Sequence, residues 1–149
     1  MNRQIKFRGK RIDGGEWSYG CYVYTLDPKK REGIIREAYI KEPLGYFGAY
    51  HEVVPETVGQ FTGLLDKNGK EVYEGDIIAG RAIVGEGGFE YTGQIVFYTC
   101  NECIGWHVED TEGRAWDLRQ IHTHISLDHI TGEIIGNIHG STELLKTIE

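Results

Sequence analysis

Residues 61–73 read FTGLLDKNGKEVY, and this stretch sets the fold class of the chain. Asn68 and Gly69 lie between two apolar runs, which is the strongest short-range signal for a β-hairpin. Glycine suits such a turn because it adopts positive φ without a steric cost. The apolar runs on either side are of strand length, so we expect an antiparallel hairpin here.

The sequence beyond this hairpin repeats the alternation of short strand and glycine-containing turn. Turns are expected at 74–76, 110–113 and 129–132. Short strands separated by such turns are typical of a small barrel or sandwich. The stretch 118–127 fits either a strand or one face of a helix, and 141–146 predicts a short C-terminal helix. Further strands are expected at 93–98, 104–108, 114–118 and 133–138.

The sequence before this hairpin predicts a second one at the amino terminus. Apolar and basic residues alternate over 5–8, which indicates a strand with one buried and one basic face. A turn at 13–15 follows, and then an aromatic strand over 16–25. We therefore expect an all-β protein, with an N-terminal β-hairpin arm and loop at 1–50. A small SH3-like barrel or sandwich body follows at 51–149, unless the two form one continuous domain.

Charge is unevenly distributed along the 149 residues. The net charge of −7 argues against a whole-surface attraction to nucleic acid or to anionic membranes. Residues 1–41 contain ten Lys or Arg and five Asp or Glu, a balance of +5, whereas the remainder has a balance of −12. The basic arm could dock on nucleic acid or on the acidic body of its own or a neighbouring subunit. We favour the second, because it needs no outside partner, and so expect a homo-oligomer.

The sequence also indicates the compartment. No apolar run reaches the length of a membrane span or of a signal-peptide core, so we expect a cytoplasmic protein without a membrane partner. Three cysteines in such a chain are expected to stay reduced rather than form a disulfide framework.

Several blocks of the chain resemble the YopX family, which is encoded mostly by phages and prophages of bacteria. The central block comprises VPETVGQFTGL at 54–64 and DKNGKEVYEGDII at 66–78. IKFRGK at 5–10 with GEWSYG at 15–20 is similar to the amino-terminal block of the family, and EIIGNI at 133–138 to its closing block. The resemblance implies a β-rich fold and a phage or prophage setting. It supplies no activity, substrate or catalytic residue, because the matched positions are those that shape turns and strands.

One cysteine pair has the spacing of a zinc site. Cys100 and Cys103 form a Cys-x-x-Cys pair, which lets two thiolates reach one metal ion. A structural zinc site usually has a second tight pair, and here only scattered histidines remain. We therefore predict no metal site and no cofactor, although metal binding by this pair stays open. The histidines that would have to complete the site are His107, His122 and His124.

Other candidate chemistry is weaker. Two His-x-Ser triplets, 124–126 and 139–141, are loosely similar to those of two-histidine phosphoesterases, but they lie close together and without an internal repeat. Acidic clusters at 71–76 and 109–112 have the oxygen ligands that Mg²⁺ prefers. Both lie on glycine-containing turns, where Asp and Glu are common for local reasons. No Glu-x-Lys accompanies them, so we favour a protein without enzymatic activity and assign no catalytic residue.

The sequence thus predicts an accessory protein that works by self-association and by binding a phage or host protein. The alternative is single-stranded nucleic-acid binding, since cations beside aromatic faces neutralise phosphates and stack bases. Either function would use the same surface of the amino-terminal hairpin. Its expected residues are Lys6, Arg8, Lys10, Trp17, Tyr19, Tyr22 and Tyr24.

Overall fold

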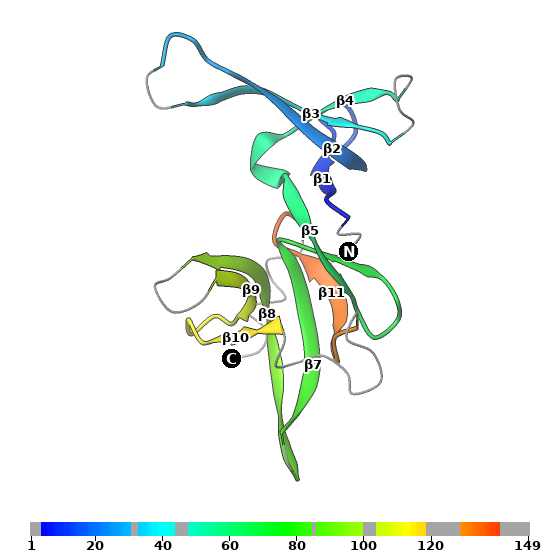
Figure 1. The fold of residues 1–149 in the computed structure, drawn as a ribbon, viewed down its shortest axis with the longest axis vertical. Coiled ribbons are helices and arrows are strands. Elements are labelled where there is room, and N and C mark those ends of the chain that lie inside the picture. Colours follow the sequence, from blue (N-terminus) through cyan, green and yellow to red (C-terminus); the bar gives the residue numbers. More distant parts are fainter. Residues whose placement is uncertain are drawn as a thin grey trace. The chain divides into compact units, whose positions relative to one another are not determined.

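The computed structural model describes residues 4–30, 33–43, 48–84, 86–99, 104–118 and 129–140. In these residues every regular element is a β-strand, apart from one short 3-10 helix, η2 (Pro55–Thr57). The chain divides into two compact units, Met1–Phe61 and Thr62–Glu149, and each is described by itself (Figure 1). The prediction of an all-β protein is confirmed. The boundary expected after residue 50 falls inside the first unit.

The first unit is an antiparallel sheet with the strand order β4-β3-β2-β1-β5. Strands β1 and β2 form the amino-terminal hairpin, with Phe7 opposite Gly20 and Lys10 opposite Trp17. Strand β2 pairs on its other side with β3, so the hairpin is part of a larger sheet rather than a lone ribbon. The strands are β1 (Phe7–Lys10), β2 (Trp17–Leu26), β3 (Ile35–Lys41), β4 (Tyr50–Val53) and the start of β5 (Gly59–Leu65).

One face of this sheet, called the inner face below, holds a small apolar core. The opposite face is the outer face. The sheet curls so that the chain just after β1 meets β4, where Arg11 and Val53 form an isolated antiparallel β-bridge. A Cβ on Gly9 would come within 2.9–3.1 Å of the Val53 side chain, so this close approach requires a glycine. Residues directly opposite in antiparallel strands share a face. The inner face buries Ala38, Ile40 and Val53, with Phe7, Tyr22, Ile35 and Val58 packed against them.

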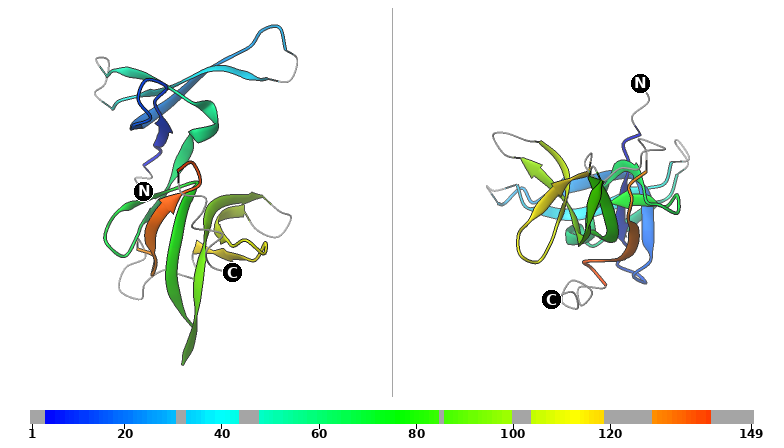
Figure 2. Two further views of the ribbon diagram at one scale, coloured as in Figure 1. Left: turned by 180° about the vertical axis from the view of Figure 1, so that it is seen from behind. Right: turned by 90° about the horizontal axis from the view of Figure 1, so that it is seen from below.

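The second unit contains a five-stranded antiparallel sheet in the order β10-β9-β8-β7-β11, and β6 pairs with β5 (Figure 2). Its strands are β6 (Glu71–Tyr73), β7 (Asp76–Val84), β8 (Gly87–Thr99), β9 (Ile104–Glu109), β10 (Ala115–Asp117) and β11 (Glu133–Asn137). The core is made by Val72, Ile78, Ala82, Tyr91, Ile95, Val108, Leu118 and Ile130.

The hairpin predicted at 61–73 is present as β5 and β6, and its turn is organised by Asp66. Gly69 has φ 80°, whereas Asn68 keeps a negative φ. Asp66 Oδ1 accepts the backbone N–H groups of Asn68 and Lys70 at 2.8 and 2.9 Å, and Oδ2 accepts that of Ile134 at 3.1 Å. A buried aspartate therefore joins this turn to the start of β11.

The sheets are not a closed barrel. Strands β10 and β11 stand at opposite ends of the sheet order, and no ladder joins them in the described part of the second unit. The prediction of a small barrel or sandwich is therefore confirmed only as far as an antiparallel all-β architecture. The helix expected at 141–146 and most of the ambiguous stretch 118–127 lie outside the described residues. Among the residues that are described, none belongs to a helix long and apolar enough to cross a membrane.

Candidate interaction surface

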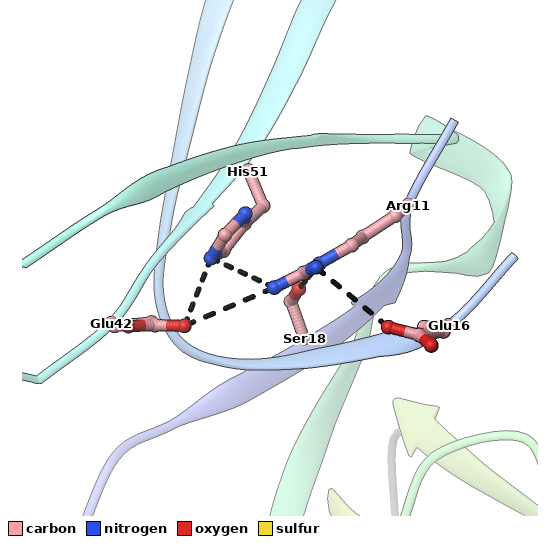
Figure 3. A network of polar contacts seen from close by, with 5 residues as sticks. All are labelled: Arg11, Glu16, Ser18, Glu42 and His51. Atoms are coloured by element: carbon pink, nitrogen blue, oxygen red, sulfur yellow. Dashed lines mark hydrogen bonds and ion pairs between the residues drawn. The ribbon is translucent and has the colours of Figure 1, made fainter. Parts of the chain in front are cut away.

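A polar network holds the base of the amino-terminal hairpin (Figure 3). Arg11 Nε donates to Ser18 Oγ at 2.7 Å, and Arg11 Nη2 lies 2.9 Å from His51 Nε2. The same His51 nitrogen lies 2.9 Å from Glu42 Oε1, and Arg11 Nη1 lies 3.8 Å from Glu16. These contacts tie the end of β1 to the start of β2 and to β4. Ser18 bonds to a guanidinium, which cannot take up a proton, so the network does not activate a nucleophile.

Five of the seven predicted surface residues lie on the outer face of the first unit. The Arg8 guanidinium lies 4.3 Å from the centroid of the Trp17 ring, and Lys10 Nζ lies 5.6 Å from the same centroid. Lys6 Nζ lies 5.0 Å from the Phe61 ring centroid. These are cation–π contacts, which form here because basic side chains in and just before one strand lie beside aromatic side chains of its neighbours. These five residues are Lys6, Arg8, Lys10, Trp17 and Tyr19.

Exposure differs strongly within this outer-face group. Arg8 is only 6% exposed, whereas Tyr19 is 45% exposed. On the same face, Lys41 Nζ lies 5.5 Å from the centroid of the Tyr50 ring, which is 58% exposed. The accessible part of the outer face is therefore aromatic more than basic. Tyr50 was missed by the sequence reasoning, because its place beside Lys41 depends on the pairing of β3 with β4.

The remaining two predicted residues, Tyr22 and Tyr24, lie on the inner face, so the expected surface is divided between both sides of β2. Tyr22 packs on Phe7, with ring centroids 5.6 Å apart, and on Tyr24 at 5.3 Å. Burial raises the pKa of the Tyr22 hydroxyl, and the neighbouring Tyr24 adds to this effect. Tyr24 itself is 51% exposed, at the margin of the core.

The far half of the β2–β3 pair projects beyond the rest of its sheet (Figure 1). Strand β1 pairs with β2 only as far as Gly20, and β4 pairs with β3 only from Ala38 onward. We call the remainder, residues 21–26 and 34–37, the distal ribbon. Its exposed large apolar side chains are Val23 at 40%, Tyr24 at 51%, Leu26 at 50% and Ile34 at 43%.

Part of this ribbon is visible in the sequence. Residues 21–26 read CYVYTL, and the uncharged run is visible without a structure. The exposure of Leu26 and Ile34 was not predicted, because it depends on where β1 and β4 end.

The described parts of the second unit show structural roles for the other candidates. Buried His107 has Nδ1 3.1 Å from the Gly105 carbonyl oxygen, and its ring packs on Tyr98. Asp76 Oδ2 accepts the Tyr73 N–H at 2.8 Å, as expected of a turn acid. Within the described ranges no three His, Cys, Asp or Glu side chains are grouped to hold a metal ion. Several earlier candidates lie outside those ranges: Cys100, Cys103, His122, His124, Ser126 and Ser141.

A shallow hollow of about 420 Å³ also lies in the second unit, beside the middle of β7 and β8. Lys67 and Arg81 line it together with Glu90, so its charges are mixed. Lys67 Nζ is also 3.5 Å from Glu133, which further neutralises the hollow. The distal ribbon, with its exposed apolar side chains, is therefore a stronger candidate for an interaction site than this hollow of mixed charge.

Comparison with known proteins supports the fold. A family model described as YopX protein matches residues 6–146. The crystal structure of protein EF1440 from Enterococcus faecalis is similar with a TM-score of 0.50 and 21% sequence identity, covering 97% of this chain and 99% of that one. At this identity the likeness concerns the fold alone. No curated protein is significantly similar in sequence.

Proposed function

Because this chain belongs to the YopX protein family, we propose that it is a cytoplasmic accessory protein of a phage or prophage that works by binding rather than catalysis. Its first partner is a second copy of itself, and a phage or host protein is the next. The observation that carries the proposal is the distal ribbon, whose large apolar side chains are 40–51% exposed.

A ribbon of two strands needs a further layer to cover its apolar side chains. A two-stranded antiparallel ribbon is marginally stable in water, because it has no third layer to cover its apolar side chains. Several large apolar side chains exposed on one short segment are typical of interaction sites in soluble proteins. Val23 points to the outer face and Tyr24 to the inner face, so both sides of the ribbon gain from being covered.

The charge distribution supports a second copy as the occupant. Residues 1–41, which include the whole ribbon, have a balance of +5 within a chain of net charge −7. Opposite charges on the two halves of the chain favour association of two copies at low salt, and the ribbon itself has no net charge because Arg36 and Glu37 balance, so two ribbons can meet without like-charge repulsion.

The proposal is tested by native mass spectrometry of the untagged full-length protein. We expect a mass that is a multiple of 16.9 kDa with nothing added. A monomer at every concentration up to the solubility limit would refute self-association. A monomer with a bound adduct the size of a nucleotide would favour the second candidate.

That second candidate is single-stranded nucleic-acid binding by the outer face. It is favoured by the exposed Tyr19 and Tyr50 rings, which lie among Lys10 and Lys41 on one surface. The double variant Lys10→Glu/Lys41→Glu should then abolish salt-sensitive binding of a labelled oligonucleotide. The matched control is Lys67→Glu/Lys70→Glu in the second unit. Binding that is equally strong in both double variants would exclude the outer face.

A further inference from the structure

The backbone of β2 has an open hydrogen-bonding edge over the distal ribbon. Across the β1–β2 hairpin, the Arg11 N–H donates to the Glu16 carbonyl at 2.8 Å. Hydrogen-bonded pairs recur at every second residue of an antiparallel ladder, so the even-numbered residues of β2 direct their backbone groups toward β1. The first residue of β1, Phe7, lies opposite Gly20, so β1 does not extend along the ribbon. No described strand therefore takes up these groups at Tyr22, Tyr24 and Leu26.

The odd-numbered residues of β2 face the other way. Asp27 follows β2 directly, and its N–H donates to the Ile34 carbonyl at 2.9 Å on the β3 side. Glu42, which follows β3, likewise donates to Ala49 on the β4 side at 3.0 Å. The alternation is therefore consistent across the sheet, and Val23 and Thr25 make the bonds that hold β2 to β3.

This open edge has little of the usual protection against pairing, and the register shift between Thr25 and Leu26 places its extra residue in β3 rather than in β2. Natural edge strands carry charged residues, proline or bulges that discourage contact with another strand. Residues 21–26 contain no charge, no proline and no glycine, and their tyrosine, valine and threonine favour strands. The corresponding edge of β3 differs, because it carries Arg36 and Glu37. Of the two long edges of the ribbon, β2 is thus the one suited to a partner strand.

We propose that two copies of this chain pair antiparallel along the open edges of β2, with the two-fold axis at Tyr24. This inference rests on the self-association proposed above and identifies the contact between the two copies, the pair of β2 edges, which is called the seam below. An isologous contact requires each residue to meet its counterpart symmetrically. With the axis at Tyr24, that residue meets its own copy, and Tyr22 meets Leu26 of the second copy. Every backbone group that β2 directs to the open edge of the ribbon is then paired.

The side chains fit the same register. Tyr22, Tyr24 and Leu26 all lie on the inner face, and Tyr22 already packs on the core residue Phe7. Pairing two edges would join the two small cores into one apolar layer across the seam. Tyr24 and Leu26, each about half exposed in one copy, gain the most burial. On the outer face Val23 lies opposite Thr25 of the second copy, an uncharged pair of β-branched residues.

Two variants test the seam by weakening it. Tyr24→Lys places like charges directly opposite each other at the axis and should raise the dimer dissociation constant on the order of 100-fold. Tyr24→Pro removes an N–H that points to the open edge, so the ladder to β3 stays intact. The matched control is Ile83→Lys, a similarly exposed apolar residue of the second unit, at 56% against 51% for Tyr24. It should leave the dimer unchanged, and thermal unfolding shows whether each variant folds.

A cross-link tests the register directly. In a background with Cys21, Cys100 and Cys103 changed to serine, Val23→Cys/Thr25→Cys should oxidise to a covalent dimer, because the pair is close and not hydrogen-bonded. A covalent dimer together with dissociation of the Tyr24 variants supports the seam. A wild-type oligomer that both Tyr24 variants retain, without cross-linking, overturns the seam but not self-association. A wild-type monomer overturns both.

Discussion

Replacing Asp66 by alanine should strongly destabilise the second unit. The Asp66 side chain is 1% exposed and accepts backbone N–H groups of Asn68, Lys70 and Ile134. Hydrogen bonds to a charged group contribute about 1.5–3 kcal/mol each, and buried donors left without partners cost a similar amount. Contributions at one site are not additive, and water can partly replace the carboxylate. We therefore expect a loss of roughly 3–5 kcal/mol in the free energy of unfolding.

The assay is urea unfolding followed by tryptophan fluorescence, since Trp106 and Trp116 pack against the core of this unit. The chain provides a matched control in Asp110, whose Oδ1 accepts the N–H groups of residues two and four positions later, as Asp66 Oδ1 does. Asp110 also accepts a bond from Arg114 Nε at 2.6 Å, but this contact lies at the surface, where the Arg114 side chain is 65% exposed. Water can replace these exposed bonds, so Asp110→Ala should lose well under half as much stability. Equal losses in the two variants, or a loss below about 1 kcal/mol for Asp66→Ala, would refute the role of burial.

Two further predictions concern single positions. Gly9→Ala should destabilise the first unit by about 1–3 kcal/mol, because the new Cβ would contact the Val53 side chain. Gly14→Ala is the control, since a Cβ there meets open space and should change the stability little. Thermal unfolding of the two variants compares these effects. Burial raises the pKa of the Glu74 carboxyl, so the folded state binds its proton more tightly and loses stability as pH rises through the raised pKa. Glu74→Gln should therefore increase stability at pH 7 and leave it nearly unchanged near pH 3. An advantage that persists at low pH would contradict this explanation.

The hairpin at 61–73 shows what local sequence can predict. An Asn-Gly pair between apolar runs located β5 and β6 correctly, because turn chemistry depends on a few adjacent residues. The turn itself is organised by Asp66 rather than by a positive φ at Asn68. Aspartate at the start of a turn was a signal already present in the sequence. Its bond to Ile134 was beyond prediction, because that partner lies in a distant strand.

Strand β2 shows why the candidate surface was only partly predicted. The alternation along β2 places Trp17 and Tyr19 opposite to Tyr22 and Tyr24, but both faces of the strand are aromatic. Polarity therefore could not indicate which face is buried. That is decided by Ala38, Ile40 and Val53 from β3 and β4, which cover only the inner face. Whether a sheet closes into a barrel depends on similarly distant pairings, and this explains why the all-β class was predicted correctly while closure into a barrel was not found.

The strand order of the second unit also bears on how the protein folds. Strands β7 to β10 follow one another as a meander, so their ladders close over short stretches of chain. Strand β11 instead returns to the far side of β7, where Asn137 pairs with Asp76. Pairing β11 with β7 closes a long loop, and the loss of chain entropy comes before any stabilising contact forms. We therefore expect this pairing to form late. During synthesis this edge of β7 stays uncovered until β11 has left the ribosome, which exposes it to misassembly in the meantime.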